Sequence, residues 1–197
     1  MQIFDISQEV FSASVYPGDP APQRKQLCSM GQGDLYNLTA FSMCAHNGTH
    51  VDAPFHFLSN GKTVEQIPLD AFVGWCYVAR WDGDVTAESA KRIFENAQGS
   101  ARVLIAGNAT VTLDGAKVFA DSGICLLGNE SQTVGPEDAP MQVHLCLLEK
   151  EIVLLEGLVL YAVPEGHYLL NAAPLNLAGA DGAPCRAWLI PAEELGL

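Results

Sequence analysis

The most informative stretch of the chain is residues 46–56, which read His46-Asn47-Gly48-Thr49-His50-Val51-Asp52-Ala53-Pro54-Phe55-His56. Three of the five histidines of the chain fall inside these eleven residues, and they share the stretch with one aspartate. Imidazole and carboxylate groups together are the usual ligands of Zn²⁺ and similar divalent ions. Clustering of this kind rarely serves packing alone, so the stretch predicts a metal site.

A metal-binding helix does not fit this stretch. His46 and His50 are four residues apart and would share one face of a helix, as in the zincin metalloproteases. However, Gly48 and Pro54 make a helix costly here, and no glutamate follows the first histidine as the zincin pattern requires. The stretch is therefore predicted to be extended.

An extended chain brings three ligand-type side chains to one side, because His50, Asp52 and His56 are separated by even numbers of residues. The first two histidines would then lie about 13 Å apart at ~3.3 Å per residue, which is an awkward span for one ion. A bend is therefore predicted at Asn47-Gly48, since both residue types tolerate positive φ. Thr49 either orients a ligand through its hydroxyl or packs as an ordinary β-branched residue.

The rest of the chain predicts more strands than helices. Thr86 is a candidate cap for a first helix and Gly123 a candidate end for a second. The helical patterns are Thr86 to Gln98, Asp114 to Asp121 and about Ala139 to Lys150. The strand patterns are Trp75 to Ala79, Ala101 to Ala106, Ile124 to Leu127, Ile152 to Leu155, Leu158 to Val163 and Ala187 to Ile190. An α/β or α+β domain with a largely β core is expected, and with 197 residues and no repeat it is expected to be one domain, 1–197.

Composition argues against several partners and locations. A formal net charge of −13 with only ten Lys and Arg would repel nucleic acid. The N-terminal residues lack the basic region and apolar run of a signal peptide, and no apolar stretch reaches the ~18 residues of a membrane span, so a cytoplasmic location without membrane contact is expected. The cysteines stand singly and are expected to be reduced core thiols: Cys28, Cys44, Cys76, Cys125, Cys146 and Cys185.

His144 and Glu156 form a second candidate pair, twelve residues apart. Spacing alone favours a histidine on a helix surface and a solvated glutamate. The remaining histidine, His167, is expected to be structural. Spacing alone therefore predicts no metal ligand among His144, Glu156 and His167.

The stretch at 46–56 resembles the cyclase-type amidohydrolase family that includes bacterial kynurenine formamidase and isatin hydrolase. That family has the motif His-x-Gly-Thr-His-x-Asp-x-Pro-x-His, and every fixed position is met here. The resemblance spans most of the chain and extends to Tyr16-Pro17-Gly18-Asp19, Asn60-Gly61-Lys62, Ile67-Pro68-Leu69, Val143-His144 with Glu156, Pro174-Leu175 and Asp181 to Ala187.

The resemblance implies an α/β fold of the swivelling β/β/α type, which is β-rich, with a mixed sheet or barrel core and peripheral helices. It also implies homodimers or homotetramers and two divalent ions per subunit, zinc or manganese. The implied ligands are His46, His50 and Asp52 for the first ion, with Asp52, His144 and Glu156 holding or bridging the second. His56 is implied to be the catalytic acid or base.

These observations lead to the hypothesis of a metal-dependent hydrolase. It would use metal-activated water to cleave a non-peptide carbon–nitrogen bond in a small formamide, of the arylformamidase type, or in a small cyclic amide. A lactone hydrolase and a metal-binding protein without turnover are the alternatives. Kynurenine formamidases share a tryptophan at the position that corresponds to Tyr16 in this chain. Tyr16 either stacks on an aromatic substrate or covers the core.

Overall fold

The computed structural model describes residues 1–196, and its central feature is one large sheet. The strands are β1 (Phe4–Asp5), β2 (Gln23–Cys28), β3 (Leu38–Ser42), β4 (His50–Asp52), β5 (Val73–Arg80), β6 (Gly83–Val85), β7 (Arg102–Ala106), β8 (Ala109–Val111), β9 (Leu126–Asn129), β10 (Val153–Glu156), β11 (Gly166–Asn171), β12 (Gly182–Pro184) and β13 (Trp188–Pro191). The α-helices are α1 (Ala87–Asn96), α2 (Leu113–Ser122) and α3 (Met141–Leu148). Short 3₁₀ helices are η1 (Met30–Gln32), η2 (Pro54–His56), η3 (Val64–Gln66), η4 (Leu69–Ala71) and η5 (Ala192–Leu195).

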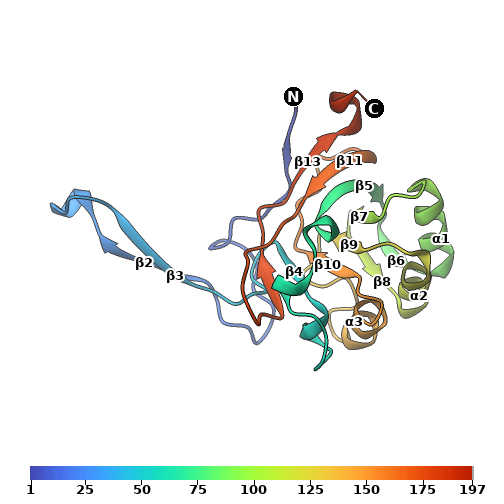
Figure 1. Ribbon diagram of the computed structural model, residues 1–197, viewed down its shortest axis with the longest axis horizontal. Coiled ribbons are helices and arrows are strands. Elements are labelled where there is room, and N and C mark those ends of the chain that lie inside the picture. Colours follow the sequence, from blue (N-terminus) through green and yellow to red (C-terminus); the bar gives the residue numbers. More distant parts are fainter. Residues whose placement is uncertain (197) are drawn as a thin grey trace.

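Nine strands form a mixed sheet in the order β1-β13-β11-β5-β7-β9-β10-β4-β12. The four central strands, β5, β7, β9 and β10, are parallel to their neighbours within this set, and the outer pairs are antiparallel. The helices lie together on one side of the curled sheet (Figure 1). The expected β-rich α/β fold with a mixed sheet and peripheral helices is therefore confirmed.

The central strands are buried on both faces, because their alternate residues enter two separate cores. One set packs beneath the helices and includes Tyr77, Ala79, Val103, Ile105, Leu127 and Leu154. The other set packs against the N-terminal segment and the outer strands and includes Cys76, Val78, Leu104, Leu126, Val153 and Leu155. This is why these strands read as short continuous apolar runs instead of strict alternations.

The helix ends follow the local chemistry of the sequence. The side chain of Thr86 accepts a hydrogen bond from the backbone N–H of Ser89 and caps α1, as predicted. Gly123 adopts φ 80° directly after α2, which only glycine does without strain, so the predicted end of that helix is also confirmed. Of the six predicted strands, five overlap observed strands.

The strand predicted from Leu158 to Val163 is wrong. This segment forms only a single bridge, between Leu158 and Ser7, and then turns. Its apolar residues Leu158, Leu160 and Val163 are buried in the core outside the helices although the backbone is irregular. Burial of a loop therefore produced the apolar pattern that predicted a strand.

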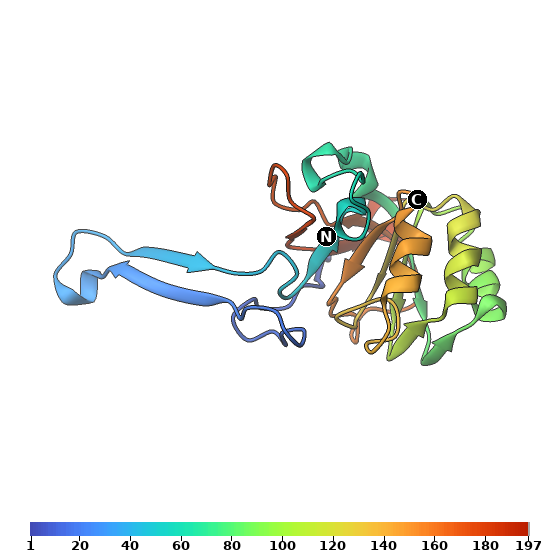
Figure 2. The ribbon, with the colours of Figure 1, turned by 90° about the horizontal axis from the view of Figure 1, so that it is seen from below.

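The hairpin of β2 and β3 projects far from the body of the molecule, as both views show (Figures 1 and 2). We call residues 23–42 the arm. Its two strands are exposed along almost their whole length and pair only with each other. No sequence pattern predicted it, because neither face of the arm packs on a core.

All six cysteines are free thiols, as expected, but only Cys76 is fully buried and Cys28 lies on the exposed strand β2, so the expectation that all six lie in the core is wrong. No helix within residues 1–196 has the length and apolar character needed to cross a membrane. Burial raises the pKa of the Cys185 thiol to about 12, which keeps this thiol protonated and unreactive at neutral pH.

Candidate metal centre

The strand β4 lies at the middle of the candidate site, because it pairs with strands from two distant parts of the chain. On one side it is antiparallel to β10, which places Glu156 opposite His50. On the other side it is antiparallel to β12, which places Gly182 opposite Asp52. Strands near residues 155 and 183 therefore meet at the predicted motif.

The chain bends just before β4, as predicted. Gly48 adopts φ 66°, and its carbonyl oxygen accepts a hydrogen bond from Nδ1–H of His50 at 2.9 Å. Asn47 is buried and accepts the backbone N–H of Cys44 through its side-chain oxygen at 2.9 Å. This bend brings the ring of His46 to 5.1 Å from that of His50.

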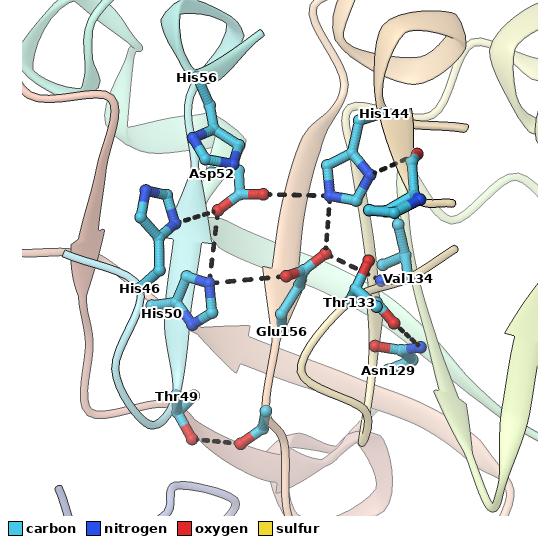
Figure 3. Close-up of polar contacts among 12 residues, drawn as sticks. His46, Thr49, His50, Asp52, His56, Asn129, Thr133, Val134, His144 and Glu156 are labelled. Atoms are coloured by element: carbon cyan, nitrogen blue, oxygen red, sulfur yellow. Dashed lines mark hydrogen bonds and ion pairs between the residues drawn. The ribbon is translucent and has the colours of Figure 1, made fainter. Parts of the chain in front are cut away.

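Asp52 is buried, and its carboxylate faces three imidazoles (Figure 3). Its Oδ1 lies 2.8 Å from Nδ1 of His46 and 3.4 Å from Nε2 of His50. Its Oδ2 lies 3.4 Å from Nε2 of His144. A single buried carboxylate therefore faces three histidines, which is the arrangement expected of a bridging ligand.

His144 and Glu156 complete the cluster, and the interpretation from spacing alone was wrong for both. His144, on α3, is 3% exposed, and Glu156, at the end of β10, is 2% exposed. Their Nε2 and Oε1 atoms are 3.2 Å apart, and Oε2 of Glu156 lies 3.5 Å from Nε2 of His50. The other bond to Oε1 comes from the backbone N–H of Val134 at 2.8 Å. The structure thus brings both residues beside His50 and Asp52.

His56 stands beside the cluster. The extended conformation predicted for the motif ends at Asp52, and the 3₁₀ helix η2 then turns the chain back. The turn brings the ring of His56 to 4.2 Å from that of His46. Nδ1 of His56 lies 3.0 Å from Oδ2 of Asp181, a residue that no local sequence pattern singled out.

The electrostatics of this cluster are dominated by the carboxylates. Burial alone would lower the pKa of each of these three histidines, but the nearby negative charge of two carboxylates outweighs it. They raise the pKa of His46 to about 9 and that of His50 and His144 to about 10. Burial alone would raise the pKa of Asp52, but its contacts with the three histidines hold this pKa well below its usual range. Positive charge is therefore strongly favoured between these side chains.

The donor set fits a divalent ion. Each of His46, His50 and His144 has one ring nitrogen committed to an outer acceptor, namely Asp181, the carbonyl of Gly48 or the carbonyl of Pro140. The other nitrogen of each ring faces the carboxylates, as metal-binding histidines do. Among the described residues, Nε2 of His50 is buried with no hydrogen-bond partner. Ligand-type atoms of two sets approach within 4.8 Å of one another: His46, Asp52 and His56, and His50, Asp52 and Glu156.

A cavity of about 280 Å³ opens over these side chains. Tyr16 lies on its wall, and the tyrosine hydroxyl donates to the carbonyl of Glu137 at 2.8 Å, which ties the N-terminal loop across the opening. Thr133 also lines it, and within residues 1–196 its buried hydroxyl has no hydrogen-bond partner. The volume is near the lower end for ligand pockets, so the cavity suits a small substrate.

Among the hydrogen bonds of the described residues, the hydroxyl of Thr49 makes none to a ligand-type side chain. Its hydroxyl donates to the carbonyl of Gly157 at 2.6 Å and accepts the backbone N–H of Gln8 at 2.9 Å. It therefore joins the bend before β4 to the residue after Glu156 (Figure 3). This is a packing and hydrogen-bonding role, and it aligns the two ligand-bearing strands.

Solved structures share this architecture. A structure described as a predicted metal-dependent hydrolase from Bacillus stearothermophilus superposes with a TM-score of 0.82 at 28% identity, covering 95% of this chain and 97% of that one. Isatin hydrolase A from Labrenzia aggregata superposes with a TM-score of 0.83 at 21% identity, covering 96% and 93%. The fold and the buried ligand-type cluster define a hydrolase with a site for a divalent metal.

The chain belongs to the cyclase family, since the family model described as “Putative cyclase” matches residues 4–135. The kynurenine formamidase of Salinibacter ruber is 35% identical over 211 residues, covering 98% of this chain and all of the relative. That of Paracidovorax citrulli is 35% identical over 208 residues, covering 95% of each. The protein is thus a hydrolytic enzyme of this family.

Proposed function

We propose that the protein hydrolyses a non-peptide carbon–nitrogen bond in a small formamide of an aromatic amine or in a small cyclic amide. The observation that carries this proposal is the convergence of four buried ligand-type side chains and two partly buried histidines, His46 and His56, on a single small cavity. The similarity to kynurenine formamidases over nearly the full length of both chains supports the choice of bond.

We assign the ligands of two ions, zinc or manganese, to the residues of the cluster. His46, His50 and Asp52 would hold the first ion, and Asp52, His144 and Glu156 would hold or bridge the second. A divalent ion supplies Lewis-acid activation of water and of a carbonyl group. The carboxylates of Asp52 and Glu156 supply the negative charge that such ions require in a buried site.

The chain's own groups then position the substrate and move protons. His56 lies at the edge of the cluster, so we assign it the transfer of a proton to the leaving nitrogen. Tyr16 would stack on an aromatic substrate while its hydroxyl remains bonded to the opposite wall. The substrate ring would then lie between the N-terminal loop and the histidines.

The substrate class is tested by an activity screen of the metal-loaded protein. We expect kcat/KM for an N-formyl aromatic amine or a cyclic imide to exceed that for a phosphomonoester at least ~10-fold, since a chain of net charge −13 does not attract polyanions. Faster phosphoester cleavage would contradict the class. Cleavage of lactones alone would favour the lactone hydrolase, and metal binding without any turnover would favour a non-catalytic protein.

We further propose that residues 1–197 act as one domain in the cytoplasm, where the six free thiols would stay reduced.

We also propose that the arm binds a second copy of the chain. An isolated two-stranded hairpin is marginally stable in water, yet this one exposes six large apolar side chains: Leu27, Met30, Leu35, Tyr36, Leu38 and Phe41. The arm has two basic residues, Arg24 and Lys25, and one acidic residue, Asp34, so its net charge is positive, whereas the whole chain is strongly acidic. Its charge therefore complements the body of another copy.

The base of the arm offers a place for the tip of its partner. An apolar groove of about 680 Å³ lies there, lined in part by Phe11, Phe41, Met43, Leu175 and Trp188. Two arms that lie antiparallel would place each tip in the groove of the other copy, which closes the assembly as a twofold dimer. A homotetramer would need a further interface.

This assembly predicts the effect of one substitution at the tip. Leu35 is 93% exposed, and Leu35→Asp should convert dimers to monomers at micromolar concentration, because a carboxylate would have to enter the apolar groove. Leu69→Asp is the matched control, since Leu69 is 69% exposed on the body. Sedimentation equilibrium measures both. A wild-type protein that is monomeric would contradict the proposal, and so would a Leu69→Asp variant that dissociates as readily.

A further inference from the structure

One carboxylate oxygen joins two of the site's histidines. Oδ2 of Asp181 lies 3.0 Å from Nδ1 of His56 and also 3.0 Å from Nε2 of His46. His46 uses its other nitrogen to contact Asp52 at 2.8 Å. A continuous path therefore runs from His56 through Asp181 and His46 to the buried carboxylate at the centre of the cluster.

The backbone holds Asp181 in this place. Its carbonyl accepts the N–H of Ala53 at 2.8 Å, and the next residue, Gly182, pairs with Asp52 across the sheet. A Cβ atom at Gly182 would lie 2.7 Å from Cε1 of His46, so only glycine lets the imidazole come this close. The position of the carboxylate is thus set by strand pairing and not by a freely rotating loop.

Asp181 is not placed as another ligand of the buried cluster. It contacts the nitrogen of His46 that points away from Asp52, and its side chain is 42% exposed whereas that of Asp52 is 1% exposed. A carboxylate oxygen only accepts hydrogen bonds, so both imidazoles must donate to it. That fixes the proton of His56 on Nδ1 and leaves Nε2 free to exchange a proton.

We propose that Asp181 is the positioning residue of the reaction, which fixes the tautomer and orientation of His56 as the proton carrier and of His46 as a metal ligand. This inference rests on the proposed function in so far as His56 moves a proton. The same carboxylate–imidazole arrangement orients catalytic histidines and metal-binding histidines in other enzymes. Here one carboxylate serves both at once.

The test uses Asp181→Asn and Asp181→Ala in the metal-loaded, full-length protein. We expect kcat on a formamide to fall about 10- to 100-fold with KM nearly unchanged, since the acid or base is misoriented while the cavity remains. An activated ester such as p-nitrophenyl acetate should lose less than about threefold, because its leaving group needs little protonation. Metal content should stay above about half of the wild-type value, since Asp181 holds only the outer nitrogen of His46.

Asp19→Asn is the matched control. Asp19 lines the same cavity, and its side chain contacts only the thiol of Cys44, at 3.7 Å, among the hydrogen bonds of the described residues. This variant measures whatever part of the effect comes from the loss of one negative charge beside the cavity. Equal losses for Asp19→Asn and Asp181→Asn would overturn the positioning role.

A spectroscopic measurement keeps this inference separable from the proposed function. In protein with ¹⁵N-labelled histidine, the Nδ1–H signal of His56, identified by its loss in His56→Ala, should be present in the wild type and lost or exchange-broadened in Asp181→Ala. That result stands even if no amide is hydrolysed. An unchanged signal, or equal losses of kcat on the formamide and the activated ester together with loss of metal, would show that Asp181 is structural.

Discussion

Asp52→Ala should lose metal and activity together. The carboxylate is 1% exposed and faces three imidazoles, so its removal leaves the implied ions without their shared negative ligand. Metal content measured by elemental analysis after purification without chelator should fall to below about a tenth of the wild-type value. Hydrolysis of a formamide should fall to the background rate. The effect is the largest we expect from any single substitution.

Asp121→Ala is the control for this prediction. Asp121 makes a single ion pair with Lys150, at 3.8 Å, and its side chain is 79% exposed, so the same change of side chain should leave metal content and kcat unaltered. If Asp52→Ala binds metal at wild-type stoichiometry, the cluster is not the metal centre. If the wild type itself takes up neither Zn²⁺ nor Mn²⁺, the metal-dependent mechanism is wrong.

His56→Ala should separate catalysis from metal binding. As a proton carrier, His56 should contribute about 10²–10⁴-fold to kcat, while the metal content stays near that of the wild type. Activated esters should lose much less than formamides. Added imidazole should restore part of the lost rate, because the substitution leaves space beside His46 and Asp181.

His167→Ala is the matched control for that variant. His167 lies on β11, away from the cavity, and its ring contacts the hydroxyl of Ser100 at 3.3 Å. Its replacement should leave kcat on the formamide within about twofold. If His56→Ala loses its metal as completely as Asp52→Ala does, His56 is a metal ligand and not the proton carrier. The closeness of His56 to His46 and Asp52 would then reflect shared metal binding.

The sequence predicted the parts of the site that are close together along the chain. The bend at Gly48 and the extended segment from His50 to Asp52 follow from local backbone preferences, and both are present. The burial of His144 and Glu156 does not follow from such preferences. It depends on α3 and β10 packing beside β4, and only the family resemblance implied it.

Asp181 was missed for the same physical reason. It is 125 residues from His56 in sequence, and strand pairing between β4 and β12 brings the two together. The only signal was that Asp181 begins one of the segments that resemble the cyclase family. The arm was missed because its strands meet no core, so they carry no apolar alternation from which a strand is recognised.

The position of β4 between β10 and β12 has a consequence for the order of folding. A segment near residue 50 has no neighbours in the large sheet until strands near residues 155 and 183 have formed, so its pairing closes long loops and has high contact order. The histidines of the motif leave the ribosome well before their partners. A growing chain therefore exposes an incomplete set of ligands, and we expect the centre to close only after β10 and β12 have been synthesised and have paired with β4.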